Sequence, residues 1–388
     1  MTEEIAERAR HDGRLAIDTE FVSERRYQAQ LCLVQVAVAD AGAPEGVRTD
    51  VLDPLDERAM PDFKPLAGAL ADPEIEVIVH AGRQDVAILR RTWATDVTHV
   101  FDTQVAAGFL GFGNQEGYES LVRRALGVTL KGGEGFTRWD KRPLTDKQLG
   151  YAADDARCLL TLGQEIENRL RERGRLEWAR EECAVVEDSR DERSAERSYE
   201  RLPKLTRLDA QGRAVARRLC EWRDRLARET DRPPPSVVPD QALVELARRT
   251  PASRAALENI RGLPQQILHR RGTELLEEIA AGRNEDPPPP PPHAAKRNPR
   301  DAPLVSLAQA LVRQRSLDSG IATELIATQG ELAALVAALR RSGEGDGVRA
   351  LHGWRRELIG DELRELIEGR CAVAVEPGGP LSLVSRSP

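Results

Sequence analysis

The sequence has few cysteines and no long hydrophobic run. Its five cysteines, among 388 residues, stand far apart, and none forms a C-x-x-C pair. This spacing argues against a zinc site and against a disulfide framework. No apolar stretch approaches the roughly 20 residues that a membrane-spanning helix needs. The first residues, MTEEIAERARHDGR, are charged throughout and contain no apolar signal core. We therefore expect a cytoplasmic protein that does not enter a membrane.

Basic residues are outnumbered by acidic residues, 57 to 64, and the charge is unevenly distributed along the chain. The formal net charge is −7. Residues 1–200 carry a net charge of −12, residues 201–300 a net charge of +7, and residues 301–388 a net charge of −2. A carboxylate-rich region joined to a basic region is typical of a metal-dependent nuclease with a separate nucleic-acid tether. Sign asymmetry between domains is also common without such a role.

Hydrophobic patterning divides the chain into an α/β part and two helical parts. Up to about Leu170, short apolar runs alternate with helical stretches, which indicates an α/β domain with a mixed sheet. The expected strands are 15–21, 31–39, 75–80 and 100–102, and the expected helices include 62–70, 84–91, 118–126 and 146–170. After about Arg201 no strand is predicted, and apolar residues recur at helical spacing.

Six consecutive prolines separate the two helical parts. Pro287–Pro292 cannot continue a helix, and they favour an extended polyproline II spacer. A docking site for a proline-reading partner is the alternative role. The expected organisation is an α/β domain, a helical domain, a proline-rich linker, a second helical domain and a flexible tail, at 1–200, 201–285, 286–302, 303–375 and 376–388.

The segment LAIDTEF places two carboxylates in the first expected strand. Alternate side chains of a strand share a face, so Asp18 and Glu20 point the same way. Two carboxylates in an otherwise apolar strand are costly unless a cation lies between them. Their oxygen atoms suit Mg²⁺ or Mn²⁺. The alternative is an edge strand whose polar face is solvated.

A third carboxylate, Asp85, lies in the first turn of the helix that follows the strand EVIV and a glycine-containing turn. An acid at this position also complements the helix dipole. On its own it is therefore more often a stabilising surface charge than a metal ligand.

The segment TDKQLGYAADD opens the long helix expected at 146–170. Thr145 and Gln148 have the spacing of a capping box. Tyr151 and Asp155 lie four residues apart and hence on the same face of the helix. Spacing alone leaves Asp154 open as the rival acid. The adjoining stripe, which we expect to be buried, consists of Leu149, Ala152, Ala156 and Leu160.

In this order the three segments resemble the DEDD exonuclease superfamily in its tyrosine-bearing branch, and the ribonuclease D family closely. The resemblance extends to QLCLVQVA, VFDTQVAAGFLG and WDKRPLT. Residues 205–281 are similar to the helicase-and-RNase-D C-terminal (HRDC) fold, and residues 353–369 look like the end of a second such module. The resemblance implies a ribonuclease-H-like α/β domain with a mixed sheet, followed by two all-α HRDC-like modules.

The same resemblance implies the site and its chemistry. Its acids would be Asp18, Glu20, Asp85 and Asp155, which favours Asp155 over Asp154, and Asp102 would be structural. Two divalent metal ions would assist hydrolysis from the 3′ end of RNA, releasing nucleoside 5′-monophosphates, with tRNA precursors as the family's expected substrate. Asp18, Glu20 and Asp155 would hold one ion, and Asp18 and Asp85 the other. Tyr151, with an ordinary pKa of about 10, would orient water more readily than deprotonate it. No small-molecule cofactor is expected.

The first helical domain offers a run of arginines for phosphate contacts. They lie on one expected helix, and the alternative is a solvated helix face; they are Arg213, Arg217, Arg218, Arg223, Arg225 and Arg228. Trp222, by its spacing, is expected in the core.

Three other functions use parts of the same pattern. A 3′→5′ DNA exonuclease would share the fold and the acids, and recognition of the ribose 2′-OH would distinguish it. A catalytically silent nucleic-acid-binding protein would have no reason to retain all four acids and the tyrosine. A purely helical interaction scaffold would leave the carboxylates unexplained.

Overall fold

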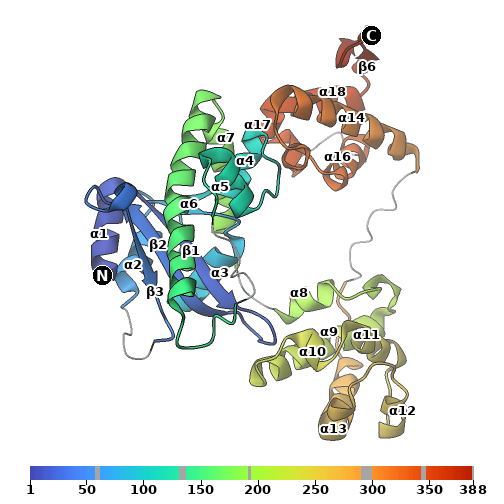
Figure 1. Ribbon diagram of the computed structural model, residues 1–388. Coiled ribbons are helices and arrows are strands. Elements are labelled where there is room, and N and C mark those ends of the chain that lie inside the picture. Colours follow the sequence, from blue (N-terminus) through green and yellow to red (C-terminus); the bar gives the residue numbers. More distant parts are fainter. Residues whose placement is uncertain (57–61, 131–136, 191–193, 290–298, 342–346, 387–388) are drawn as a thin grey trace. The chain divides into compact units, whose positions relative to one another are not determined.

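A computed structural model describes the chain apart from residues 57–61, 131–136, 191–193, 290–298, 342–346 and 387–388. It contains two compact units (Figure 1), each made of separate segments. The first unit comprises residues 1–20, 31–190 and 297–388, and the second comprises residues 21–30 and 191–296. This division differs from the expected linear order of domains, because 21–30 belongs with the first helical part and 297–388 with the α/β domain. Part of the expected linker, residues 290–298, lies outside the described residues.

The α/β domain contains one five-stranded mixed sheet, as expected. Its order is β3-β2-β1-β4-β5, with β4 parallel to both β1 and β5, and β3 antiparallel to β2. The strands are β1 (Arg14–Val22), β2 (Gln30–Ala39), β3 (Val47–Leu52), β4 (Glu76–Val79) and β5 (Val100–Asp102). The four expected strands are confirmed to within one residue at each end. The edge strand β3 was not expected, because five of its six residues are only half-buried and three polar residues interrupt its apolar ones.

Between residues 2 and 187, the described part of this domain contains seven α-helices. They are α1 (Thr2–Asp12), α2 (Lys64–Leu70), α3 (Arg83–Trp93), α4 (Thr103–Ala107), α5 (Tyr118–Leu126), α6 (Asp146–Glu172) and α7 (Leu176–Glu187). The expected capping box of Thr145 and Gln148 opens α6. A side chain at Gly163 could not be accommodated, since its Cβ would lie 2.7 Å from Ile78 of β4. This glycine therefore lets the long helix approach the sheet closely. Leu149 is 37% exposed, so it does not belong to the buried stripe that we expected.

The second unit is helical, with the α9 apolar stripe at its centre. Its helices are α8 (Ala195–Glu200), α9 (Ala210–Glu229), α10 (Pro234–Val237), α11 (Asp240–Arg249), α12 (Arg254–Glu258) and α13 (Gln265–Gly282). Trp222 is buried, as its spacing predicted. The segment 21–30, which begins with the last two residues of β1, is anchored here by Tyr27. The Tyr27 hydroxyl donates to Asp224 at 2.8 Å, and its backbone N–H donates to Asp231 at 3.0 Å.

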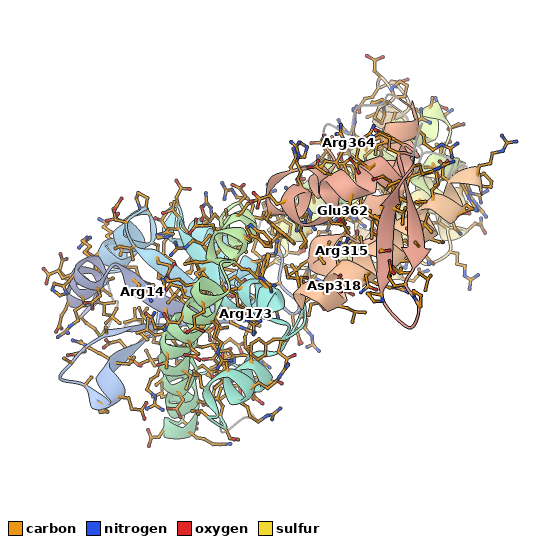
Figure 2. The ribbon with its side chains drawn as sticks, turned by 90° about the horizontal axis from the view of Figure 1, so that it is seen from above. Arg14, Arg173, Arg315, Asp318, Glu362 and Arg364 are labelled. Carbon is orange, nitrogen blue, oxygen red and sulfur yellow. The ribbon has the colours of Figure 1, made fainter. Side chains whose placement is uncertain are left out.

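Residues 299–385 form a C-terminal module of helices and one hairpin. Its elements are α14 (Ala302–Ser319), α15 (Thr323–Ile326), α16 (Gln329–Arg341), α17 (Gly353–Arg355), a π-helical turn (Arg356–Gly360), α18 (Asp361–Ile367), β6 (Cys371–Val375) and β7 (Leu381–Ser385). Arg315 of α14 forms an ion pair with Glu362 of α18 at 2.8 Å (Figure 2).

The β6–β7 hairpin corrects two expectations, that strands end after about Arg201 and that residues 376–388 form a loose tail. The two strands pair antiparallel, with Val373 opposite Leu383, and both of these side chains pack against the hydrophobic core. A turn with Gly378 at a φ of +69° connects the strands. The alternating apolar residues of each strand are too few to stand out in the sequence.

The C-terminal module shares one hydrophobic core with the α/β domain. The Trp354 ring lies between two aromatic rings of that domain, at centroid distances of 4.8 Å from Phe109 and 5.8 Å from Trp178. Glu182 of α7 binds Arg355 at 2.7 Å and Arg349 at 3.1 Å. A cut after residue 200 would therefore remove part of the core of the α/β domain as well as the helical parts.

Among the described helices, none by itself is long and apolar enough to cross a membrane. One bent pair, 299–319 with 323–340, meets that test by length and composition. Several of its apolar side chains, such as Leu311 and Leu335, are buried in the shared core, whereas Leu317 is exposed.

Candidate active site

Five side chains singled out in the sequence come from three elements of the α/β domain. Asp18 and Glu20 lie on β1, Asp85 in the first turn of α3, and Tyr151 and Asp155 in the first part of α6. The pKa of Asp18 is raised well above its usual value by burial, and then by the charges of Asp85, Glu20 and Asp155. The other three carboxylates therefore lie close enough to Asp18 to act on its charge.

The other three carboxylates are perturbed in the same direction. Burial raises the pKa of Glu20 to about 8, with further contributions from the charges of Asp155 and Asp85. Burial also raises the pKa values of Asp85 and Asp155 to about 6 each. Asp85 is 9% exposed and Asp155 8% exposed, so water solvates their charges poorly.

Hydroxyl groups partly offset this crowding of negative charge. Thr19 donates a hydrogen bond to the Asp85 carboxylate, which lowers the pKa of Asp85 against the effect of burial. Tyr151 does the same for Asp155. The Tyr118 hydroxyl donates to the backbone carbonyl of Asp155. Sequence reasoning missed both Thr19, which lies between Asp18 and Glu20 on β1, and Tyr118.

The donor set fits divalent cations, although the described residues include no ready-made cluster of three or more metal-binding side chains. Four carboxylates offer only oxygen atoms, which are the ligands that Mg²⁺ and Mn²⁺ prefer. Among the described residues, no positively charged side chain is a principal influence on any of the four pKa values. The site thus concentrates negative charge that the surrounding protein leaves uncompensated.

Asp102 lies beside this site and has the structural role expected of it. Its carboxylate is buried and accepts hydrogen bonds from the backbone N–H groups of Ala81 at 3.0 Å and Gly82 at 2.9 Å. It also accepts from Gln104 at 2.9 Å, capping α4. Ala81 has a φ of +53°, and a Cβ at Gly82 would clash with Val79. Asp102 therefore holds a tight turn that leads directly into the helix carrying Asp85.

The segment WDKRPLT supports the ring of Tyr151. The Trp139 ring stacks on the Tyr151 ring at a centroid distance of 6.4 Å, with 27° between the planes. Arg142 binds the Asp53 carboxylate at 2.6 Å and the backbone carbonyl of Cys32 at 2.9 Å. These contacts fasten the segment to the sheet. Its similarity to ribonuclease D was the only signal in the sequence that pointed to these residues.

The arginines expected to contact phosphate are engaged within the second unit. Arg223 is 2% exposed and binds Asp240 at 2.6 Å, so it is a core residue and its assignment to RNA binding is wrong. The other five have the following partners: Arg213 binds the carbonyl of Leu208, Arg217 binds Glu285, Arg218 binds Glu278 and Glu285, Arg225 binds Glu278, and Arg228 binds Asp224.

Family models match both parts of the chain that this geometry singles out. The model described as a 3′-5′ exonuclease matches residues 1–171, and the model of the HRDC domain matches residues 212–279. The mixed sheet, the four converging acids and the attached HRDC domain define a 3′→5′ exonuclease.

Full-length relatives narrow this class. Ribonuclease D of Gluconacetobacter diazotrophicus is 36% identical over 377 residues, covering 96% of this chain and 92% of that protein. Ribonuclease D of Jannaschia sp. is 34% identical over 384 residues, covering 97% and 96%. The crystal structure of Escherichia coli RNase D, described as an exoribonuclease involved in structured RNA processing, matches with a TM-score of 0.81 and 28% identity, covering 95% and 96% of the two chains.

The chain belongs to the ribonuclease D family and is a 3′→5′ exoribonuclease. The exonuclease superfamily to which that family belongs depends on divalent metal ions. The substrate of this chain is RNA, as the ribonuclease D family and the HRDC domain indicate.

Proposed function

We propose that this exoribonuclease hydrolyses RNA at the cluster of Asp18, Glu20, Asp85, Tyr151 and Asp155, with two divalent ions, Mg²⁺ or Mn²⁺, bound by the carboxylates. The observation that carries the proposal is the convergence of four carboxylates whose pKa values are all raised. Such crowding of negative charge destabilises the site when no cation is bound. The same crowding favours the binding of cations, which is how a metal-dependent enzyme would use it.

The carboxylates would divide the two ions between them. Asp18, Glu20 and Asp155 would hold one ion, and Asp18 and Asp85 the other. When bound, such ions neutralise the phosphate and stabilise charge on the attacking and leaving oxygen atoms. Thr19 would keep the Asp85 carboxylate in a fixed orientation through its hydrogen bond.

Tyr151 serves as a hydrogen-bond donor in this proposal. Burial and the charge of Asp155 raise the pKa of Tyr151 above its usual value, so the phenol stays protonated at neutral pH. A protonated phenol cannot act as a base, but it can orient Asp155 and the attacking water. Stacking against Trp139 would hold its ring in place.

The proposed products are nucleoside 5′-monophosphates, and the proposed substrates are structured RNAs such as tRNA precursors. The role described for the E. coli relative, structured RNA processing, supports this choice. We also propose that the enzyme acts in the cytoplasm, where such precursors are made.

The test uses 5′-labelled RNA and DNA of the same sequence, with Mg²⁺ or Mn²⁺. The protein should shorten the RNA stepwise from its 3′ end, and Asp18→Asn should slow this by several orders of magnitude while circular dichroism shows an intact fold. Near-normal turnover by a folded Asp18→Asn protein would refute the assignment of the site. Faster digestion of the DNA would refute the proposed substrate.

A further inference from the structure

A shallow groove on the second unit combines an apolar floor with arginine side chains. It has a volume of about 140 Å³ and lies between the end of α9, the end of α10 and the start of α13. Its floor and rim are formed by Leu226, Val237, Ile267, Arg232, Arg270 and Arg271. Small-molecule sites usually enclose about 300–1,000 Å³. The groove is therefore better suited to one part of a chain-like ligand that continues across the surface.

Two arginines of the groove differ from most arginines on α9 in having no carboxylate partner among the described residues. Arg270 is exposed and has no ion pair or hydrogen bond with the described residues. Arg232 is exposed and donates only to the backbone carbonyl of Ser236 at 3.1 Å, so no described carboxylate offsets its charge. Arg271, in contrast, is compensated by Glu274 at 3.0 Å and by Glu229 at 3.7 Å. Two uncompensated positive charges thus flank the apolar floor.

We infer that this groove binds a single-stranded segment of the RNA substrate, with Arg232 and Arg270 contacting phosphates and a base resting on Leu226 and Ile267. The inference rests on the proposed function and locates the RNA tether at the groove, away from the α9 arginines. Five of those six arginines already bind a carboxylate, of Glu278, Glu285, Asp224 or Asp240, and the sixth, Arg213, is half-buried and donates to the backbone carbonyl of Leu208. A polyanion gains affinity by releasing its counterions to uncompensated charges. An unpaired base gains affinity from a surface on which it can stack or rest, including an arginine plane.

The size of the effect follows from the number of phosphate contacts. Each contact on a single strand contributes about 0.7 to the slope of log affinity against log salt concentration. At 0.1 M salt this corresponds to about a fivefold change in affinity for each contact. The double variant R232Q/R270Q should therefore bind single-stranded RNA about 25-fold more weakly than the parent, with a salt slope smaller by about 1.4.

A matched control lies on the same helix. Arg283, at the C-terminal end of α13, is exposed and is separated from Arg270 by about 20 Å along the helix. Arg283→Gln removes the same charge from the same unit without touching the groove. Its RNA affinity and salt slope should stay close to those of the parent.

The experiment measures fluorescence anisotropy of a labelled single-stranded RNA with the full-length protein, in chelator and without divalent ions so that the RNA stays intact. Parent-like affinity and salt slope in R232Q/R270Q would overturn the inference, as would an equal loss in R283Q. Hydrolysis of a tetranucleotide in Mn²⁺ should be unchanged in R232Q/R270Q. If no protein hydrolysed any RNA, the proposed function would fail, while the binding comparison would still decide whether the groove holds RNA.

Discussion

The metal-free active site should be a source of instability, and Asp155→Asn tests this directly. Asp155 is buried on α6, and its pKa is raised from 3.8 to about 6 by burial. Asparagine has nearly the same shape and can still accept the hydrogen bond from Tyr151. The substitution therefore removes the charge and one metal ligand with little change in packing. We expect it to abolish RNA hydrolysis and to stabilise the metal-free protein.

The size and the pH range of the stabilisation follow from the shift in pKa. Because the folded state holds the Asp155 proton more tightly than the unfolded state, stability falls as the pH rises from about 4 to about 6. Each pKa unit corresponds to about 1.4 kcal/mol, so the full penalty is about 3 kcal/mol and is reached above about pH 6. Asp155→Asn should remove this penalty at pH 8 and have no such benefit near pH 4.

Thermal unfolding in chelator at pH 4 and pH 8 measures the difference in stability between the parent and Asp155→Asn. A titration with Mn²⁺ at pH 8 then measures how much stability each protein gains from the metal ion. The parent should gain stability from Mn²⁺, and the variant should gain much less. Asp154→Asn is the matched control, because Asp154 is the neighbouring residue, is 46% exposed and pairs with Arg157 at 2.7 Å. That variant should keep RNA hydrolysis and show no rise in stability at pH 8.

Two results would refute the reasoning. If Asp155→Asn were no more stable than the parent in chelator at pH 8, burial of the Asp155 carboxylate would not destabilise the folded protein. If Asp154→Asn abolished hydrolysis and Asp155→Asn did not, the wrong acid would have been assigned to the site.

Three further substitutions test the surroundings of the site. Tyr151→Phe should leave calorimetric binding of Mn²⁺ nearly unchanged but slow single-turnover hydrolysis substantially; an unchanged rate would leave Tyr151 only a packing role. Asp102 uses both carboxylate oxygens as acceptors, and Asp102→Asn leaves only one. The substitution should lower the free energy of unfolding in urea by about 1–3 kcal/mol. It should also lower kcat more than it raises KM, because the turn before Asp85 loosens. Trp354→Ala should cost about 3–5 kcal/mol, since Trp354 is buried between Phe109 and Trp178; a loss below 1 kcal/mol would show that the C-terminal module contributes little to the shared core.

Local sequence signals predicted much of the α/β domain. The strands β1, β2, β4 and β5 were found because each is an apolar run, and α6 because Thr145 and Gln148 mark its start. The edge strand β3 is half-exposed and carries too little apolar periodicity to be found. The β6–β7 hairpin is short, and its stability depends on contacts with a core that the local sequence does not reveal.

Contacts between distant residues could not be predicted in this way. Nothing near Arg218 or Arg225 in the sequence shows that Glu278 binds both, since the partners are 60 and 53 residues apart. The assignment of segment 21–30 to the second unit has the same origin. For the candidate site, spacing identified the acids one at a time, and only the resemblance to ribonuclease D indicated that they form a single site. Thr19 and Tyr118, which support the site, were missed. The roles of the acids in binding metal remain predictions.

The anchoring of Tyr27 in the second unit has a consequence for the order in which the protein can fold during synthesis. Tyr27 lies 204 residues before its partner Asp231. At roughly 5–20 residues per second, a ribosome needs on the order of 10–40 s to cover that distance. Throughout that time Tyr27, in the loop leaving the strand of Asp18 and Glu20, lacks its later partners Asp224 and Asp231. The first unit, in turn, requires residues 297–388 to complete its core. The domain that begins the chain is therefore among the last parts of it to be finished.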